Sequence, residues 1–382
     1  MWYVIFHLIL FSFVPFALKQ TFKSPQFNIA MVGEHYVSMK WNGLLVCGII
    51  IYSVFVGFAY DTGQDYWHYY GHYISSVHGL SDWWGSGREV GYQYLIQKLA
   101  MVFSSPAAFF VLCALFNNFA WANVSSLFGK ASSVVMWLLY LNLYPLSMNL
   151  YRQYIAMAFL MIAYCVVTRK NYSFRLKDKA NCFFIILLLL AFLFHTSSIA
   201  GMFLYFLCFL LCRININKWI LLGSVAIVSI SANTILVGAF EQFNIIVLSF
   251  QTISGKGYEF EEMLDTQWGE SRMIYVIMVI HLIYVWYADK VLKATNGSRF
   301  LFYAMVLSFI LIPISLQEIL LRIRIYMAPF MSISIALTLY YNIKQKGLGI
   351  NIPLIFAFIV DLAYICFNLY NLGEFFPLQY KI

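Results

Sequence analysis

The chain has 382 residues, of which 62% are hydrophobic and 10% are charged, and its mean hydropathy is +0.77. Soluble domains carry about 25% charged residues, so this chain has too few charges to cover a water-facing surface. The composition therefore excludes a soluble protein and predicts an integral membrane protein. We attribute the net charge of +8 to the orientation of the chain in the bilayer, and we expect no nucleic-acid partner.

Apolar runs of about 20 residues predict membrane-spanning helices. The first run is interpreted as a helix and not as a cleavable signal peptide, because no basic region precedes it and no small-residue cleavage site follows. Twelve helices are predicted, at residues 1–18, 41–60, 107–127, 132–147, 151–168, 181–194, 196–212, 219–238, 272–289, 300–316, 323–343 and 351–372. Several are short, so roughly 10 to 14 crossings fit the pattern. The predicted fold is an all-α, polytopic transmembrane helical bundle, with residues 1–382 forming a single domain.

The loop charges predict an orientation, because basic residues in short loops stay on the cytoplasmic side. If the N-terminus lies outside the cell, the loops on the cytoplasmic side hold 16 of the 24 Lys and Arg residues. Two long loops, 61–106 and 239–271, then lie outside, and long loops in compact proteins are usually functional. Residues 92–104 are amphipathic, which predicts a helix that lies in the interface or begins the next span.

The first polar constellation directly follows the helix at 41–60. Two carboxylates four residues apart, Asp61 and Asp65, precede an aromatic run that begins at Tyr66. Carboxylates accept hydrogen bonds from hydroxyls, and aromatic rings stack on the apolar faces of sugars, so the pattern predicts a sugar site. The alternative is an aromatic belt at the membrane interface with helix-capping aspartates.

Two further motifs offer a general base. Arg88 and Glu89 lie between glycines just before the amphipathic segment, and Glu89 is a candidate base near the bilayer surface. The alternative is a capped helix start with a surface ion pair. His195 interrupts the apolar stretch 181–212, where it is a candidate base or phosphate ligand, or a structural histidine at a helical turn.

Arginines provide candidate anion-binding groups. Arg152 and Gln153 open the helix at 151–168, where a guanidinium adds to the positive potential of a helix N-terminus and fits phosphate with its fork of donors. The alternative is a snorkelling arginine that anchors the helix end. Later in the chain, Arg322 is four residues from both Glu318 and Tyr326, so it can pair with either on a helix face, whereas Arg324 points elsewhere.

The apolar runs contain two other kinds of candidate residue, an aspartate and seven cysteines. Asp361 lies in the middle of an apolar run, where it is a functional candidate or a buried partner of a Tyr or Asn on another helix. The seven cysteines lie in apolar runs without a His partner, so no metal site is expected.

The arginines, carboxylates and His195 together suit a lipid-linked diphosphate that carries a sugar, with arginines on the diphosphate and a base at an acceptor hydroxyl.

The order of these elements resembles the EpsG-type Wzy family, which includes O-antigen, capsular and exopolysaccharide polymerases. The elements are Asp61-Thr62-Gly63-Gln64-Asp65-Tyr66-Trp67-His68-Tyr69, Glu89-Val90-Gly91-Tyr92, Arg152-Gln153, Phe194-His195-Thr196-Ser197 and Arg322-Ile323-Arg324-Ile325-Tyr326. They span nearly the whole chain. Tyr60 stands where the family usually has a small residue before the first Asp.

The resemblance implies a GT-C-like glycosyltransferase that needs no metal and no cofactor. It would join undecaprenyl-diphosphate-linked repeat units into O-antigen or a related surface polysaccharide. It would lie as a multi-pass protein in the bacterial inner (cytoplasmic) membrane, with its active site facing the periplasm or exterior. The lipid bilayer, the undecaprenyl-diphosphate-linked glycan and a chain-length regulator protein are the implied partners.

The resemblance also implies roles. Arg152 and one of Arg88, Arg322 or Arg324 would hold the diphosphate, and His195 or Glu89 would be the base. Asp61 and Asp65 would shape the sugar site, and Tyr66, Gln153 and Tyr326 complete the expected substrate-binding set. The alternatives are an O-antigen ligase, a membrane acyltransferase, and a non-enzymatic flippase or transporter of lipid-linked sugars.

Overall fold

The computed structural model describes residues 9, 12–18, 43–60, 65–80, 89–169, 179–231, 273–293, 296–314, 318–346, 351–375 and 379–380. Over these residues the protein is helical, apart from an antiparallel pair of two-residue strands, β1 (Ala59–Tyr60) and β2 (Gln379–Tyr380). The all-α prediction is confirmed. Asp61, Arg88 and the predicted loop 239–271 lie outside the described residues.

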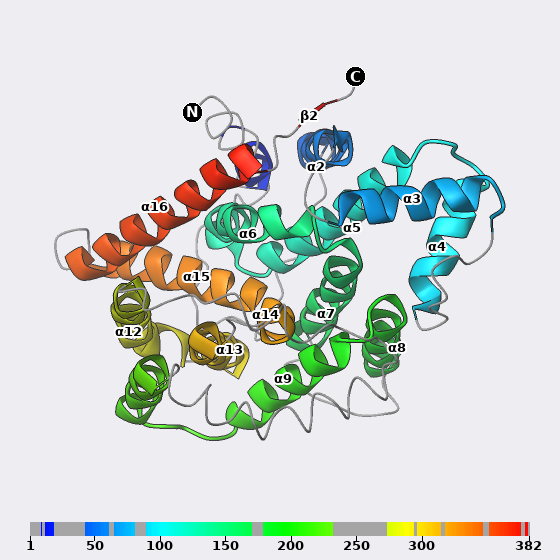
Figure 1. Cartoon of the computed structure of the whole chain (residues 1–382). Coiled ribbons are helices and arrows are strands. Elements are labelled where there is room, and N and C mark those ends of the chain that lie inside the picture. The colour runs from blue at the N-terminus through cyan, green and yellow to red at the C-terminus, as the bar shows by residue number, and fades with distance from the viewer. Residues whose placement is uncertain are drawn as a thin grey trace.

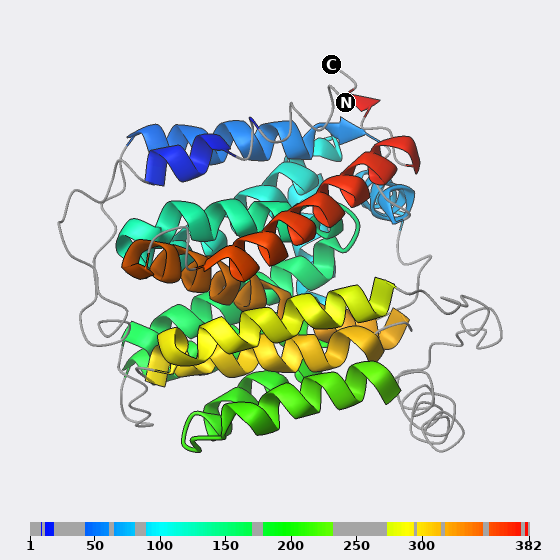
Figure 2. The same ribbon diagram turned by 90° about the vertical axis from the view of Figure 1, so that its left-hand side faces the viewer.

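The helices follow the predicted apolar runs closely. The first half of the chain contains α2 (Gly43–Gly57), α3 (Tyr66–Val77), α4 (Val90–Ala100), α5 (Ala107–Ser126), the 3-10 turn η2 (Gly129–Ala131), α6 (Ser132–Ser147) and α7 (Tyr151–Arg169). The second half contains α8 (Lys179–Phe194), α9 (Ser198–Leu211), a helix at Lys218–Ser231, α12 (Met273–Leu292), α13 (Asn296–Ile314), α14 (Glu318–Ile325), α15 (Ala328–Lys346) and α16 (Ile352–Phe375). The long helices pack side by side as a bundle (Figures 1 and 2).

Three helices of the described chain are long and apolar enough to cross a membrane. They are α5, the Tyr151–Thr168 part of α7 and the Tyr275–Leu292 part of α12. Six shorter apolar helices accompany them, including α2, α8 and α9. An all-helical protein with apolar helices of this length is compatible with a membrane protein, and the count of twelve crossings stays a prediction.

Two segments differ from the sequence-based expectation. The segment 61–106 was expected to be a long loop with one amphipathic helix, but it contains both α3 and α4, which pack on each other at the edge of the bundle (Figure 1). The helix expected at 323–343 starts only at Ala328. A turn closed by the Met327 N–H to the Arg324 carbonyl at 2.8 Å separates it from α14.

Helices α2 and α5 pack closely against each other. Gly57 at the end of α2 lies so near the backbone of Val111 in α5 that a Cβ on it would be 2.5 Å from the Val111 nitrogen. The Asn118 amide nitrogen donates to the Ser53 hydroxyl at 3.0 Å between the same two helices, so these two buried polar groups are paired. The α2–α5 contact is therefore fixed by shape and by a hydrogen bond.

Candidate functional site

The site is built around one carboxylate with two partners. Glu89 forms an ion pair with Arg152 through Oε2, and its Oε1 lies 2.7 Å from Nδ1 of His195. The side chains of Glu89 and His195 are only 5% and 8% exposed, and that of Arg152 is 18% exposed. The cluster is shielded from solvent, so its charges interact more strongly than surface charges would.

Three chain segments that are distant in sequence bring these groups together. Glu89 directly precedes α4, Arg152 is the second residue of α7, and His195 lies in the short connection between α8 and α9. Gly91 permits this approach, because a Cβ on it would lie 3.1 Å from the carbonyl oxygen of Leu193 in α8. A side chain at this position would therefore require the end of α8 to shift slightly where it meets the start of α4.

Aromatic rings surround the Arg152 guanidinium. Its centre lies 5.6 Å from the ring of Tyr69 and 5.2 Å from the ring of Tyr92, which is within cation–π range. Its Nε also donates to the Tyr69 hydroxyl at 3.4 Å. The Tyr92 hydroxyl lies 3.3 Å from Nδ1 of His72. These contacts join α3, α4 and α7 around a single cation.

Protonation follows from the surroundings of the two histidines, both of which lie outside the apolar helices. Burial lowers the pKa of His195 from its ordinary value of 6.5, although Glu89 acts in the opposite direction. Burial, together with the charges of His68 and Arg152, lowers the pKa of His72 to about 4. Both imidazoles are therefore neutral near pH 7. Since a carboxylate only accepts hydrogen bonds, Nδ1 of His195 carries the proton and Nε2 is the basic nitrogen.

Arg322 joins the cluster through its charge and through its backbone. Its guanidinium interacts electrostatically with His195 and Tyr326. Its carbonyl accepts a hydrogen bond from Nε2 of Gln153 at 2.5 Å. The hydroxyls of Tyr326 and Ser197 are 3.0 Å apart. The end of α14 is thus fastened to the first turns of α7 and α9.

Arg324 lies apart from this cluster. Its charge interacts with Tyr154 of α7 and with Tyr364 of α16, so it is directed to another part of the bundle. Asp361 is also apart, and it accepts a hydrogen bond from the Tyr284 hydroxyl at 3.5 Å. A hydrogen bond between Asp361 and a Tyr of another helix was one of the two sequence-based alternatives for this residue.

The acidic and aromatic motif lies at the edge of the cluster. The backbone N–H of Asp65 donates to Oδ1 of Asn149 at 2.9 Å, which places the start of α3 beside the start of α7. Tyr66 is buried, and its ring stacks on Phe110 of α5 with centroids 5.1 Å apart. Tyr66 therefore packs against the bundle, while its neighbour Trp67 is 49% exposed.

Sequence reasoning assigned no role to Tyr69, Tyr92 or Asn149, although the first two lie within the motifs that resemble the family. A signal was present for the first of these, because Tyr66, Tyr69 and Tyr73 recur at a spacing of three and four residues, which indicates one face of a helix. All three rings are buried. The pairing of Glu89 with both Arg152 and His195 had no comparable signal.

Metal ligands do not gather in the part of the chain that the structure describes, where no group of three or more His, Cys, Asp or Glu side chains is placed to hold an ion. The chemistry available to the cluster is that of a neutral imidazole, a carboxylate and two guanidiniums. With His195 neutral, the two arginines and Glu89 leave one excess positive charge, which suits an anionic ligand.

The fold and site together define an all-helical bundle, compatible with a membrane protein, that carries a buried, net-positive cluster where several helices begin or end. The family model described as EpsG family matches residues 43–381. This chain therefore belongs to the EpsG family, as its motifs indicated. No curated protein matches the chain, and no solved structure matches it.

Proposed function

We propose that this protein is a polysaccharide polymerase, a multi-pass glycosyltransferase that joins undecaprenyl-diphosphate-linked repeat units on the outer face of the bacterial inner membrane. The EpsG family match supports a polysaccharide-related role. The observation that carries the proposal is the sharing of Glu89 between Arg152 and His195. This arrangement combines a cation for a diphosphate with an oriented base for a hydroxyl.

The proposed reaction forms one glycosidic bond and breaks another. An acceptor hydroxyl oxygen attacks the anomeric carbon of the donor glycan, and its proton passes to Nε2 of His195. The bond from the anomeric carbon to the diphosphate oxygen breaks, and undecaprenyl diphosphate leaves with the electron pair. Arg152 and Arg322 stabilise the charge that builds up on the leaving diphosphate.

The geometry favours His195 over Glu89 as the base. Both carboxylate oxygens of Glu89 already interact with cationic or N–H groups, which lowers their tendency to accept a proton. The imidazole instead has a partner at Nδ1 that fixes the tautomer, as in other His–carboxylate pairs. In this proposal Glu89 is a positioning residue for both Arg152 and His195, while Asp65 and Asp61 contribute to the sugar site.

The test is the Arg152→Ala variant in a reconstituted assay with a purified lipid-linked repeat unit. We expect the ladder of polymer lengths to disappear, with a loss of about 100-fold or more in rate, because a donor to developing charge is removed. Arg213→Ala is the matched control, since Arg213 is exposed and follows the far end of α9. Normal polymer from Arg152→Ala would contradict the proposal.

A second variant separates chemistry from folding. Removing one partner of a buried ion pair costs about 3–5 kcal/mol because the other charge stays buried. The double variant Arg152→Ala/Glu89→Gln removes both charges, so it should recover thermal stability relative to Arg152→Ala while remaining inactive. Recovery of polymer in the double variant would show that the arginine acts only through folding.

The same assay separates the related functions. A ligase would transfer the glycan to lipid A core and leave a lipid-linked repeat unchanged. A flippase would form no glycosidic bond and would move the lipid-linked repeat across vesicles. Either result with the native protein would overturn the polymerase assignment.

A further inference from the structure

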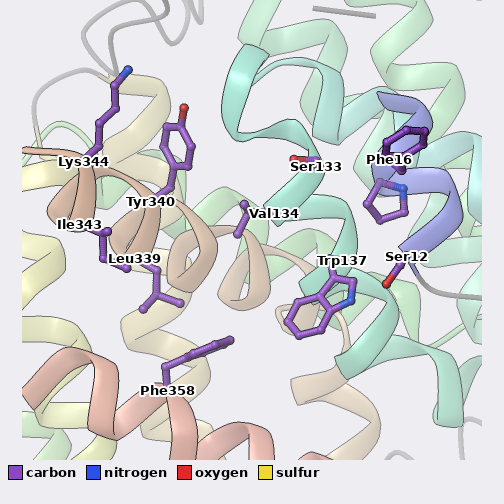
Figure 3. Close-up of a pocket in the computed structure, with 11 residues that line it drawn as sticks. Ser12, Phe16, Ser133, Val134, Trp137, Leu339, Tyr340, Ile343, Lys344 and Phe358 are labelled. Carbon is purple, nitrogen blue, oxygen red and sulfur yellow. The ribbon is translucent and has the colours of Figure 1, made fainter. Parts of the chain in front are cut away.

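The bundle contains a crevice that the proposed reaction does not use. It has a volume of about 630 Å³ and lies between two pairs of helices. One wall is formed by α15 and α16, and the other by α6 and the helix at 12–18, as Figure 3 shows with Leu339 and Phe358 facing Val134 and Trp137 across the space. A crevice of this size is within the range of small-molecule and lipid sites.

The lining is apolar along most of its length. Side chains such as Phe16, Trp137, Leu339, Ile343 and Phe358 form the walls. The helices that carry Phe16 and Phe358 also have apolar exposed surfaces, since Phe16, Phe356 and Ile359 are 55%, 63% and 56% exposed. Large exposed apolar side chains on a membrane protein indicate contact with hydrocarbon. The crevice therefore faces the bilayer and suits a hydrocarbon chain.

One end of the crevice is polar and cationic. The hydroxyl of Tyr340 and the ammonium of Lys344 lie together at this end (Figure 3), and the Nζ atom of Lys344 lies 5.8 Å from the centre of the Tyr340 ring. Ser133 lies across the space on α6 (Figure 3), and among the described lining residues there is no Asp or Glu. A phosphate group at this end would meet one ammonium and the Tyr340 hydroxyl, which complement its charge and its acceptor oxygens.

This polar end is far from the Glu89 cluster. Tyr326 touches Ser197 beside the cluster, and α15 begins two residues later at Ala328. Lys344 is 16 residues further along α15, which is about 24 Å at 1.5 Å per residue. A lipid whose phosphate lies at Lys344 is therefore a different molecule from a donor whose diphosphate lies at Arg152.

We propose that the crevice between α6, α15, α16 and the helix at 12–18 binds one acyl chain of a membrane phospholipid whose anionic headgroup is held by Lys344. The apolar walls hold the chain, and the ammonium with the Tyr340 hydroxyl selects a net negative headgroup over a zwitterionic one. This site goes beyond the proposed function, since no step of glycan transfer depends on it.

The test is native mass spectrometry of the purified full chain, delipidated and then titrated with phosphatidylglycerol or with phosphatidylethanolamine of identical acyl chains. One molecule of phosphatidylglycerol should be retained in preference, and Lys344→Gln should weaken its binding about fivefold, the effect of one Lys near a phosphate layer. Phosphatidylethanolamine should be unaffected by this change. Equal retention of the two lipids by the native protein would overturn the proposal.

Lys98→Gln is the matched control, because Lys98 is also exposed and its Nζ lies 5.4 Å from the ring of Tyr94, four residues before it. It should leave phosphatidylglycerol binding unchanged, and an equal loss would contradict a specific role for Lys344. Val134→Trp fills the crevice and should reduce binding of both lipids. Unchanged binding in this variant would place the lipid elsewhere.

A measurement on the native protein makes the result independent of folding defects. Phosphatidylglycerol with a photoreactive acyl chain should attach to α6, α15 or α16 around Val134, Leu339 and Phe358. Attachment only at other helices would overturn the proposal. Displacement of phosphatidylglycerol by an equal concentration of a polyprenyl phosphate would show that the crevice binds a polyprenyl lipid and not a phospholipid, which would overturn the proposal.

Discussion

Glu89 connects two groups whose charges must differ for the proposed reaction. It pairs with a guanidinium that is always charged and with an imidazole that must be neutral to accept a proton. A carboxylate alone would favour the charged imidazole, whereas burial favours the neutral one. The lowered pKa of His195 shows that burial prevails in this structure.

The pH dependence of polymerisation follows from this balance. Neutral His195 is present above its lowered pKa, so kcat/KM should be constant near pH 7 and fall at acidic pH, with a midpoint below 6.5. Arg152 and Arg322 act in the same direction as burial, and Glu89 opposes them. Initial rates on a lipid-linked repeat unit in detergent, from pH 4.5 to 8, provide the measurement.

The variant Glu89→Gln is the control for this assignment. It removes the influence that raises the pKa of His195, so the midpoint should move to still lower pH, and the plateau rate should fall because the tautomer is less well fixed. A midpoint above 6.5 in the native protein would contradict a buried neutral His195 as the base.

At the scale of helices, α9 and α14 meet through a glycine. A Cβ on Gly201 would lie 2.6 Å from Cγ of the Tyr326 ring and 3.1 Å from Cδ1 of Leu160. Tyr326 is fully buried, so its ring has little room to move. The missing side chain at Gly201 therefore lets Tyr326 reach Ser197 at the edge of the site.

Gly201→Ala should destabilise the protein by about 1–3 kcal/mol through overpacking, and it should lower polymerase activity by displacing Tyr326. Gly223→Ala is the matched control, since Gly223 also lies in an apolar helix but has no atom within 4 Å of the added Cβ. Thermal unfolding in detergent should show a lower Tm for Gly201→Ala and an equal or higher Tm for Gly223→Ala. Equal shifts would refute the tight contact.

The sequence was sufficient to place most helices because long apolar runs leave few alternatives. It missed α3, where tyrosines at helical spacing are interspersed with His, Ser and Gly. It also joined the last residues of α14 to α15 in one helix at 323–343, because no Gly or Pro separates Arg324 from Ala328. In both segments tertiary packing, and not local composition, decides where the helix begins and ends.

The residues of the candidate site were predicted from the sequence, but the contacts between them were not. Motif order singled out Glu89, Arg152 and His195 individually. Glu89 is 63 residues from Arg152 and 106 residues from His195, so no local spacing relates them. Their contact depends on how α4 meets α7 and α8, which follows from packing such as that at Gly91.

At the scale of the whole molecule, the charged cluster and the end of the crevice at Lys344 lie at opposite ends of α15. The loop charges predict that the end of α15 near the charged cluster faces the outside and that the Lys344 end faces the cytoplasm. Trp67 on α3 and Asn215 after α9 are exposed residues at these two ends.

Labelling of single cysteines tests this orientation. With the exposed Cys47 and Cys182 replaced by Ser, Trp67→Cys should react with a membrane-impermeant maleimide on intact spheroplasts. Asn215→Cys should react only after the membrane is permeabilised. The reverse pattern would invert the predicted topology and would place the Glu89 cluster on the cytoplasmic side.

The pair of short strands has a mechanical consequence for this end of the molecule. Ala59 pairs with Tyr380 and Tyr60 with Gln379, so the last strand is fastened to the residues that directly precede the Asp61–Asp65 motif. Asp65 is in turn tied to Asn149, three residues before Arg152. A load applied to residues 379–380, for example by a bulky fusion, would therefore act first on Ala59 and Tyr60 at the end of α2.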